Sequence, residues 1–137
     1  MKSPVTILER YINAIQTLNK QAMDNLYAPE LRMFDMTAPF ELRGAGAFAQ
    51  RVDQWFDDTA DMNMNAEASN VESKIVDGMA YMTMFMRYSD TDKDGVQNGM
   101  TNRLTWVLVP DGDDWKILHE HTSVPLKEED MSPQFEP

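Results

Sequence analysis

The beginning of the chain carries hydrophobic residues at the spacing of an α-helix. They form a single stripe, made of Ile7, Leu8, Tyr11, Ile12, Ile15 and Leu18. Ser3 and Pro4 precede this stripe, and a serine cap followed by proline at the first helical position is a favourable helix start. The spacing therefore predicts a helix over residues 4–19. A second, short helix is predicted over residues 20–27, because it has to end before Pro29.

The next segment combines a short strand, a loop and a third helix. Residues 31–35 are predicted as a strand, and Pro39 and Gly44 bracket the loop that follows it. The helical period then returns over residues 45–59, where one hydrophobic face consists of Phe48, Val52, Trp55 and Phe56. This face predicts a third helix.

After residue 61 the hydrophobic pattern changes to every second position, which is typical of strands that bury one face. Four strands are predicted, over residues 62–75, 78–89, 98–109 and 115–123, joined by hairpin turns rich in aspartate and glycine. Helices followed by a meander of long strands indicate an α+β fold. We expect a curved, mostly antiparallel sheet that wraps the N-terminal helices and leaves a cone-shaped pocket. Residues 1–125 would form this single domain, and the acidic residues 126–137 would form an exposed tail.

Composition narrows the classes of function. The chain has 137 residues, no cysteine and a net charge of −11. The absence of cysteine excludes disulfides, thiolate metal sites and cysteine nucleophiles. The negative charge opposes unaided binding to nucleic acids or anionic membranes, and no hydrophobic run approaches the ~20 residues of a membrane span. We therefore expect neither nucleic acid nor membrane as a partner. Without a signal-peptide pattern at the N-terminus, a cytoplasmic location is the default expectation.

Both histidines of the chain lie on the last predicted strand. On a regular strand five side chains would share one face: Trp115, Ile117, His119, His121 and Ser123. This row starts hydrophobic and ends polar, which predicts a strand that leaves a core and enters a pocket. There the histidines could exchange protons, bind an anion together with Arg103, or form a purely structural pair. A metal site would need Asp35 or Glu120 as a third ligand, and we predict none.

Three stretches resemble the SnoaL-like branch of the nuclear transport factor 2-like superfamily. Residues 9–12 and 31–35 resemble the first helix and first strand of ketosteroid isomerases. Residues 39–44, followed by Trp55 and Phe56, resemble a strand, loop and third helix found in many SnoaL-like proteins. The final stretches, residues 102–106 and 115–125, resemble the last hairpin of that branch. They are also similar to the association domain of calcium/calmodulin-dependent kinase II.

This resemblance implies candidate roles without fixing a function, because the superfamily hosts isomerases, cyclases, dehydratases, epoxide hydrolases and non-catalytic assembly domains. It implies that Asp35 is a general base and that Tyr11 donates a hydrogen bond to a developing oxyanion. Alternatively, Asp35 caps the turn before Pro39 or pairs with an arginine, and Tyr11 belongs to the core. The second oxyanion donor of ketosteroid isomerases, a protonated aspartate, has no clear match in this chain.

We therefore predict a cofactor-independent protein that binds a small, largely apolar ligand with a carbonyl or carboxylate group. If it is an enzyme of the isomerase, cyclase or lyase type, the predicted catalytic residues are Asp35, Tyr11 and His121. The predicted substrate-binding residues are Arg103, His119, Trp55, Trp106 and Phe34. The alternative is a non-catalytic ligand-binding or oligomerisation domain of the same fold, and a third option is water activation by Asp35 and Arg103, as in epoxide hydrolases. We also expect a homodimer formed through the outer face of the sheet.

Overall fold

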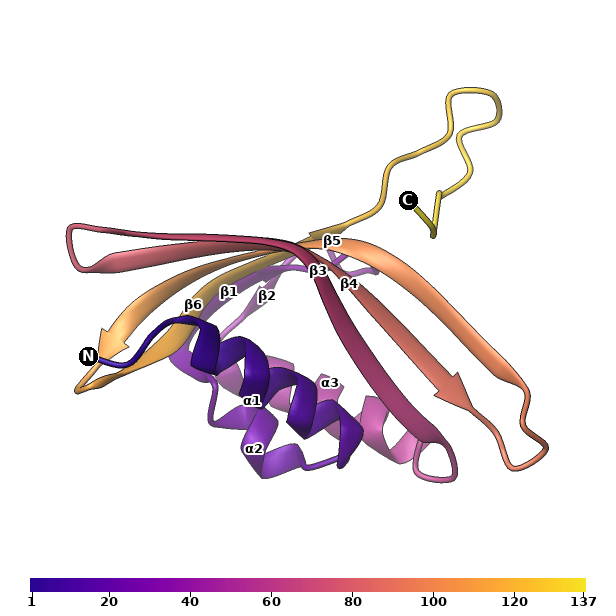
Figure 1. Cartoon of the computed structure of the whole chain (residues 1–137), viewed down its shortest axis with the longest axis horizontal. Helices are drawn as coiled ribbons and strands as arrows, with labels where there is room; N and C mark the ends of the chain where they lie inside the picture. The colour runs from indigo at the N-terminus through magenta and orange to yellow at the C-terminus, as the bar shows by residue number, and fades with distance from the viewer.

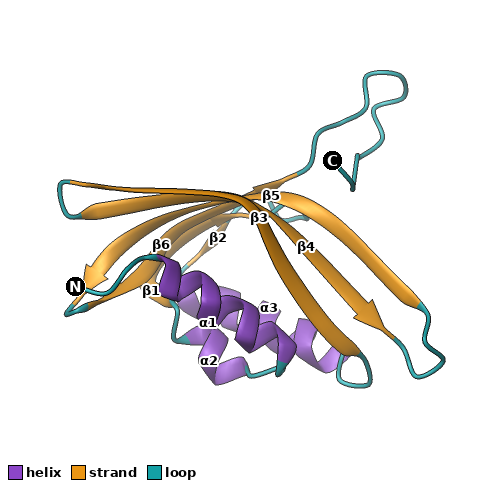
Figure 2. Cartoon of the chain, in the orientation of Figure 1, coloured by secondary structure: helices purple, strands orange, loops and turns teal.

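The computed structural model describes all 137 residues and has three helices and six strands (Figures 1 and 2). In chain order these are α1 (Val5–Gln16), α2 (Lys20–Asp24), β1 (Tyr27–Phe34), β2 (Leu42–Arg43), α3 (Ala45–Asp58), β3 (Asn63–Val76), β4 (Met79–Thr91), β5 (Gln97–Asp111) and β6 (Asp114–Ser123). The predicted α+β fold is confirmed, and each predicted helix and strand is present. The two-residue strand β2 lies in the predicted loop, and β1 begins earlier than predicted. None of the helices is both long and apolar enough to cross a membrane.

The six strands form one curved, open sheet in the order β2-β1-β6-β5-β4-β3. All neighbouring strands run antiparallel except β1 and β6, which are parallel. The three helices lie together on the concave side of the sheet (Figure 2). This arrangement follows from the sequence pattern, because the stripes of α1 and α3 and the alternating residues of the strands need a common hydrophobic interior.

The core fills much of the space between helices and sheet. From α1 it includes Ile7, Leu8 and Ile15, and from α3 it includes Val52 and Phe56. The sheet contributes fully covered residues of its concave face, including Met82, Met86, Leu104, Trp106, Leu108 and Ile117. Each such side chain contributes roughly 1.5–3 kcal/mol through burial. A pocket remains in the same space, and core residues such as Met33 and Phe48 line part of it.

A β-bulge in β6 changes which residues of this strand face the interior. Val107 pairs with His119, whereas the next residue of β5, Leu108, pairs with Ile117, so Leu118 is an extra residue in β6. An extra residue reverses the alternation of faces from that point on. Trp115 and Ile117 are buried before the bulge, and Glu120 and Thr122 are buried after it. The predicted single face from Trp115 to Ser123 is therefore wrong beyond Ile117, and His121 is exposed.

Residues 126–137 are mostly exposed but return to the sheet. Leu126 forms an isolated bridge with Pro133. The amide N–H of Thr101 then donates to the carbonyl oxygen of Phe135 at 2.7 Å. Since β6 stops pairing with β5 at Ser123, this contact occupies an edge of β5 that β6 no longer covers. Figure 1 shows the segment leaving the sheet and folding back toward it.

Candidate functional site

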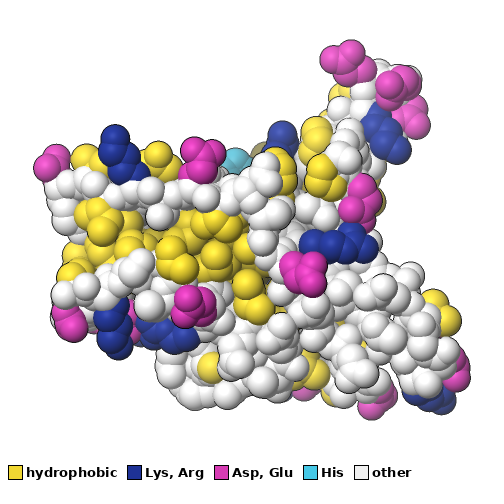
Figure 3. Space-filling model, viewed as in Figure 1, with side chains coloured by type: hydrophobic (Ala, Val, Ile, Leu, Met, Phe, Trp, Pro, Cys, Tyr) yellow, Lys and Arg dark blue, Asp and Glu magenta, His cyan; other side chains and the backbone are white.

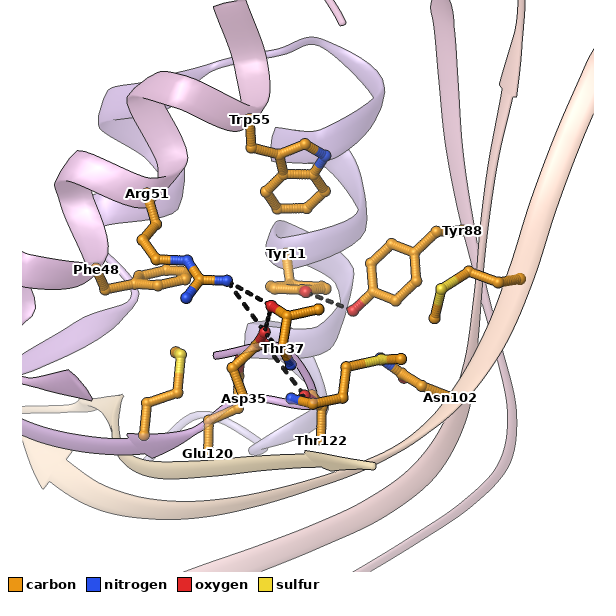
Figure 4. A pocket seen from close by; sticks show the side chains of 13 residues that line it. Tyr11, Asp35, Thr37, Phe48, Arg51, Trp55, Tyr88, Asn102, Glu120 and Thr122 are labelled. Carbon is orange, nitrogen blue, oxygen red and sulfur yellow. Dashed lines mark hydrogen bonds and ion pairs between the residues drawn. The ribbon is translucent and has the colours of Figure 1, made fainter. Parts of the chain in front are cut away.

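A pocket of about 290 Å³ lies between α1, α3 and the concave face of the sheet (Figure 4). Its hydrophobic and sulfur-containing wall consists of Met33, Met36, Phe48, Trp55 and Met100. Its polar part consists of Tyr11, Asp35, Thr37, Arg51, Tyr88, Asn102, Glu120 and Thr122. A largely apolar hollow with a few convergent polar groups is the usual form of a small-molecule site.

Asp35 lies at the end of β1 and is held by four hydrogen bonds. Its Oδ2 accepts from the N–H of Thr37 at 3.1 Å, from the Thr37 hydroxyl at 2.6 Å and from Nη2 of Arg51 at 3.1 Å. Its Oδ1 accepts from the hydroxyl of Thr122 at 3.1 Å. Arg51, on α3, also donates to the carbonyl oxygen of Ala38. The structure therefore has the alternative in which Asp35 pairs with an arginine, and its carboxylate is held in place by Arg51 (Figure 4).

Two tyrosines from different elements meet in the pocket. The hydroxyl of Tyr11, on α1, lies 2.7 Å from the hydroxyl of Tyr88, on β4. Burial raises the pKa of both phenols, and the nearby carboxyl of Glu120 raises it further, so both hydroxyls stay protonated at neutral pH. Two O–H groups share one hydrogen bond, which leaves one proton free to be donated to a third atom.

Glu120 is a buried acid, with 3% of the residue exposed. Its Oε1 accepts hydrogen bonds from the hydroxyl of Tyr27 and from Nε1 of Trp106, each at 2.7 Å. Burial raises the pKa of Glu120 from 4.5 to about 7, although the two hydrogen bonds lower it. The negative charge of Asp35 adds to the increase. The protonation of this carboxyl therefore changes near neutral pH, which is the range useful for acid–base chemistry.

Sequence reasoning missed Glu120 as a pocket residue and considered it only as a third metal ligand. The cause is the bulge at Leu118, which no residue type in the strand predicts. Because Glu120 and Thr122 alternate with the two histidines, either pair could face the interior of the sheet, and the sequence does not show which one does. Arg51 was missed as well, because it lies on the polar side of the predicted third helix. The signal that was available for Arg51 is the strand-end carboxylate Asp35, which needs a cation when it is partly buried.

Three of the predicted site residues line the pocket: Asp35, Tyr11 and Trp55. Trp106 is fully buried beneath it and reaches Glu120 rather than the pocket, because the ring of Tyr11 packs edge-on against it at 5.2 Å. Trp106 was predicted to bind substrate, but in the structure it does not line this pocket.

The other four predicted residues lie on the outer face of the sheet. Arg103 follows Asn102 in β5, and Phe34 follows Met33 in β1, so each points away from the pocket by simple alternation. Phe34 packs against the rings of both histidines, at 5.0 Å from His119 and 5.5 Å from His121. Nδ1 of His119 lies 2.6 Å from the carbonyl oxygen of Arg32, and Nε of Arg103 donates to Ser123. None of these four residues therefore lines this pocket, although Phe34 and His121 line a separate hollow together with Asp35.

Comparisons with known structures agree on the fold. An NTF2-like protein of unknown function from Pseudomonas putida KT2440 is 18% identical, with a TM-score of 0.80 over 95% of this chain and 89% of that chain. An NTF2-like superfamily protein from Salmonella enterica serovar Typhimurium is 17% identical, with a TM-score of 0.71 over 90% and 89%. A Xanthomonas campestris protein named for the calcium/calmodulin dependent protein kinase II association domain is 17% identical, with a TM-score of 0.73 over 87% and 83%.

These TM-scores establish a shared fold, and identities of 17–18% leave the activity open. A comparison with curated proteins found no match. The SnoaL-like domain family, in contrast, matches residues 5–127, which span both helical stripes, the whole sheet and every residue of the pocket. The chain therefore belongs to the SnoaL-like domain family.

Proposed function

We propose that this protein binds a small, largely apolar carbonyl compound in the pocket and catalyses proton transfer on it, as an isomerase, cyclase or lyase would. The observation that carries the proposal is Glu120, a buried carboxyl whose pKa is raised by burial to about 7 and which lines the same pocket as the Tyr11–Tyr88 pair. A general base is most effective when its pKa lies near the working pH.

The proposed reaction uses these groups in sequence. Ionised Glu120 takes a proton from the carbon next to the carbonyl, and the electron pair of that C–H bond moves toward the carbonyl oxygen. The free O–H of the tyrosine pair donates a hydrogen bond to that oxygen and keeps its proton, which stabilises the developing negative charge. Protonated Glu120 then returns its proton to the same molecule at another position. The step consumes no cofactor and leaves the enzyme in its starting state.

The charge and the size of the pocket limit the kinds of ligand that it can bind. The only cation of the pocket, Arg51, is already engaged by Asp35, Thr37 and the backbone of Ala38. A carboxylate ligand would thus meet Glu120 and Asp35 without a free partner, so we favour a neutral ligand. A volume of about 290 Å³ lies at the small end of ligand pockets, which are roughly 300–1,000 Å³, and suits one or two rings.

Exchange of carbon-bound hydrogen tests the proposal without knowledge of the natural substrate. The probe is the bicyclic ketone 2-tetralone in D₂O buffer, with loss of its α-hydrogens followed by ¹H NMR. We expect exchange faster than in buffer alone, and a decrease on the order of 100-fold or more in Glu120→Gln. Glu128→Gln, in the exposed tail, is the matched control and should exchange at the wild-type rate.

Other outcomes assign the site differently. Exchange that survives Glu120→Gln and disappears in Asp35→Asn would give the role of base to Asp35, as the resemblance to ketosteroid isomerases implies. If 2-tetralone quenches the fluorescence of Trp55, the only tryptophan that lines the pocket, but is not exchanged, the alternative of a non-catalytic ligand-binding domain is favoured. The absence of both effects across a panel of one- and two-ring ketones would refute the proposal.

A further inference from the structure

The two oxygens of Glu120 have different surroundings. Oε1 accepts two hydrogen bonds at 2.7 Å, one from Tyr27 at the start of β1 and one from Trp106 on β5. Oε2 makes no hydrogen bond within the chain. It is also not one of the fully covered polar atoms without a partner, which are Oδ1 of Asp24 and Oδ1 of Asn102. Because Glu120 lines the pocket, Oε2 is the oxygen that a ligand can reach.

The hydrogen-bond donors around Glu120 favour one position for the proton on this carboxyl. An indole N–H can only donate a hydrogen bond, so Oε1 has to be an acceptor toward Trp106 whether Glu120 is ionised or neutral. The hydroxyl of Tyr27 donates to the same oxygen. With both donors directed at Oε1, we place the proton of the neutral form on Oε2, on the side of the pocket.

We propose that Tyr27 and Trp106 are positioning residues that hold Oε1 and leave Oε2 as the single atom through which Glu120 exchanges a proton with a ligand. This inference rests on the proposed function. In the forward step the C–H bond of the ligand breaks, an O–H bond forms at Oε2 and the electron pair remains on the ligand. In the return step the O–H bond at Oε2 breaks and a C–H bond forms. Neither Tyr27 nor Trp106 lines the pocket, so both act through Glu120.

Tyr27 allows this arrangement to be changed at a single atom. The residue is 4% exposed and its ring packs against Phe48, with centroids 4.4 Å apart. Phenylalanine at position 27 would keep this packing and lose only the hydroxyl. Because the lost hydrogen bond favours the ionised form, the midpoint of the Glu120 titration should rise by about one pH unit. Tyr81→Phe is the matched control, since Tyr81 is 43% exposed and lies on the outer face, opposite Val107.

The experiment is a pH titration of carboxyl-¹³C-labelled protein by NMR, with the Glu120 signal assigned by its absence in Glu120→Gln. We expect an upward shift in Tyr27→Phe and none in Tyr81→Phe. The pH profile of 2-tetralone exchange should move by the same amount. An unchanged midpoint in Tyr27→Phe, or an equal shift in both variants, would overturn the inference.

The unmodified protein provides a second readout. The indole N–H resonance of Trp106 should move with pH and share the midpoint of Glu120, because Oε1 gains negative charge on ionisation. The indole of Trp115, which donates to the backbone oxygen of Lys2 at 2.8 Å, should stay constant over the same range. A constant Trp106 resonance would contradict the positioning role.

These readouts separate the two proposals. If the titrations behave as expected but 2-tetralone is not exchanged, the arrangement of Glu120 stands and the proposed reaction fails. If exchange depends on Glu120 while the Tyr27→Phe midpoint is unchanged, the reaction stands and the positioning role fails.

Discussion

Glu120 is the only acidic residue among the buried residues of a chain that has 23 aspartates and glutamates. Its two hydrogen bonds offset only part of the cost of removing a carboxylate from water, as the raised pKa shows. Acidic groups with strongly raised pKa values are concentrated at functional sites, where a loss of stability is tolerated in exchange for reactivity. This cost to stability can be measured even without a known substrate.

The first prediction is that Glu120 makes the protein less stable as the pH rises. The folded state binds the proton with a pKa of about 7, against 4.5 for the ordinary group, so the folded state holds more protons between these values. The contribution of protonated Glu120 to the free energy of unfolding is fully present below pH 4.5 and is lost as the pH rises through 7. The free energy of unfolding of Glu120→Gln, taken relative to that of wild type, should therefore increase by on the order of 2–3 kcal/mol as the pH rises from 5 to 8.

Urea denaturation at several pH values measures this difference. Glutamine at position 120 keeps an oxygen that can accept from Tyr27 and Trp106, so the charge is the main change. Glu128→Gln, in the exposed tail, should follow the wild-type curve at each pH. A constant difference between Glu120→Gln and wild type from pH 5 to pH 8 would show that the folded state does not raise the pKa of Glu120.

At the level of elements, the sequence was sufficient where one period continues without interruption. The stripes of α1 and α3 and the alternation along β3, β4 and β5 each produced an element where the pattern predicted it. The bulge in β6 was not predictable, because one extra residue changes no composition and leaves a strand of ordinary length. That one residue moved both histidines to the outside and brought Glu120 and Thr122 inside.

The residues of the candidate site could likewise be predicted only in part from the sequence. Tyr11 and Trp55 lie on helical stripes and Asp35 at a strand end, so local pattern assigned them to the right elements, and the resemblance to ketosteroid isomerases implied the site roles of Tyr11 and Asp35. Arg51 and Tyr88 reach the pocket only through packing between distant elements, as the ion pair with Asp35 and the hydroxyl contact with Tyr11 illustrate. Contacts of this kind depend on the three-dimensional arrangement and have no signature within a short window of sequence.

The second prediction concerns the C-terminal segment as an element that completes β5. The N–H of Thr101 bonds to the carbonyl oxygen of Phe135, and Glu136 forms an ion pair with Arg87 of β4. Deletion of residues 134–137 removes the acceptor of the Thr101 amide. We expect the amide hydrogen of Thr101 to exchange at least about fivefold faster, because a hydrogen bond contributes roughly 1 kcal/mol. NMR-detected hydrogen exchange measures this rate.

The neighbouring strand provides the internal control for this deletion. Amides near Leu104 bond to adjacent strands and should keep their wild-type rates. Since Met100 and Asn102 flank Thr101 and line the pocket, a local effect would show that the C-terminal segment supports the pocket wall. Equal rates at Thr101 in both proteins would show that this segment is not docked in solution.

For the whole molecule, two surfaces present hydrophobic side chains to solvent. The outer face of the sheet contains Tyr81, paired across the strands with Val107. Figure 3 shows a second group of hydrophobic side chains between the β3–β4 hairpin and the start of α1. The exposed hydrophobic residues of these elements include Val5 and Ile75, and Ile75 pairs with the buried Ala80, so it faces the helix side. Exposed hydrophobic surface of this kind is typical of contacts between protein chains.

The third prediction is a homodimer in which two copies pack through the outer face of the sheet. Sedimentation should give twice the monomer mass of 15.7 kDa at an ionic strength that screens the net charge of −11 on each copy. Val107→Glu would place a charge at the centre of this face and should give a monomer, whereas Ile75→Glu should remain dimeric. The reverse result would place the contact at the surface beside α1, and a wild-type monomer would exclude both.

Because α1 and the pocket lie on the concave side, a dimer through the outer face leaves the pocket of each copy open, and 2-tetralone exchange per chain should be the same in the monomeric Val107→Glu variant.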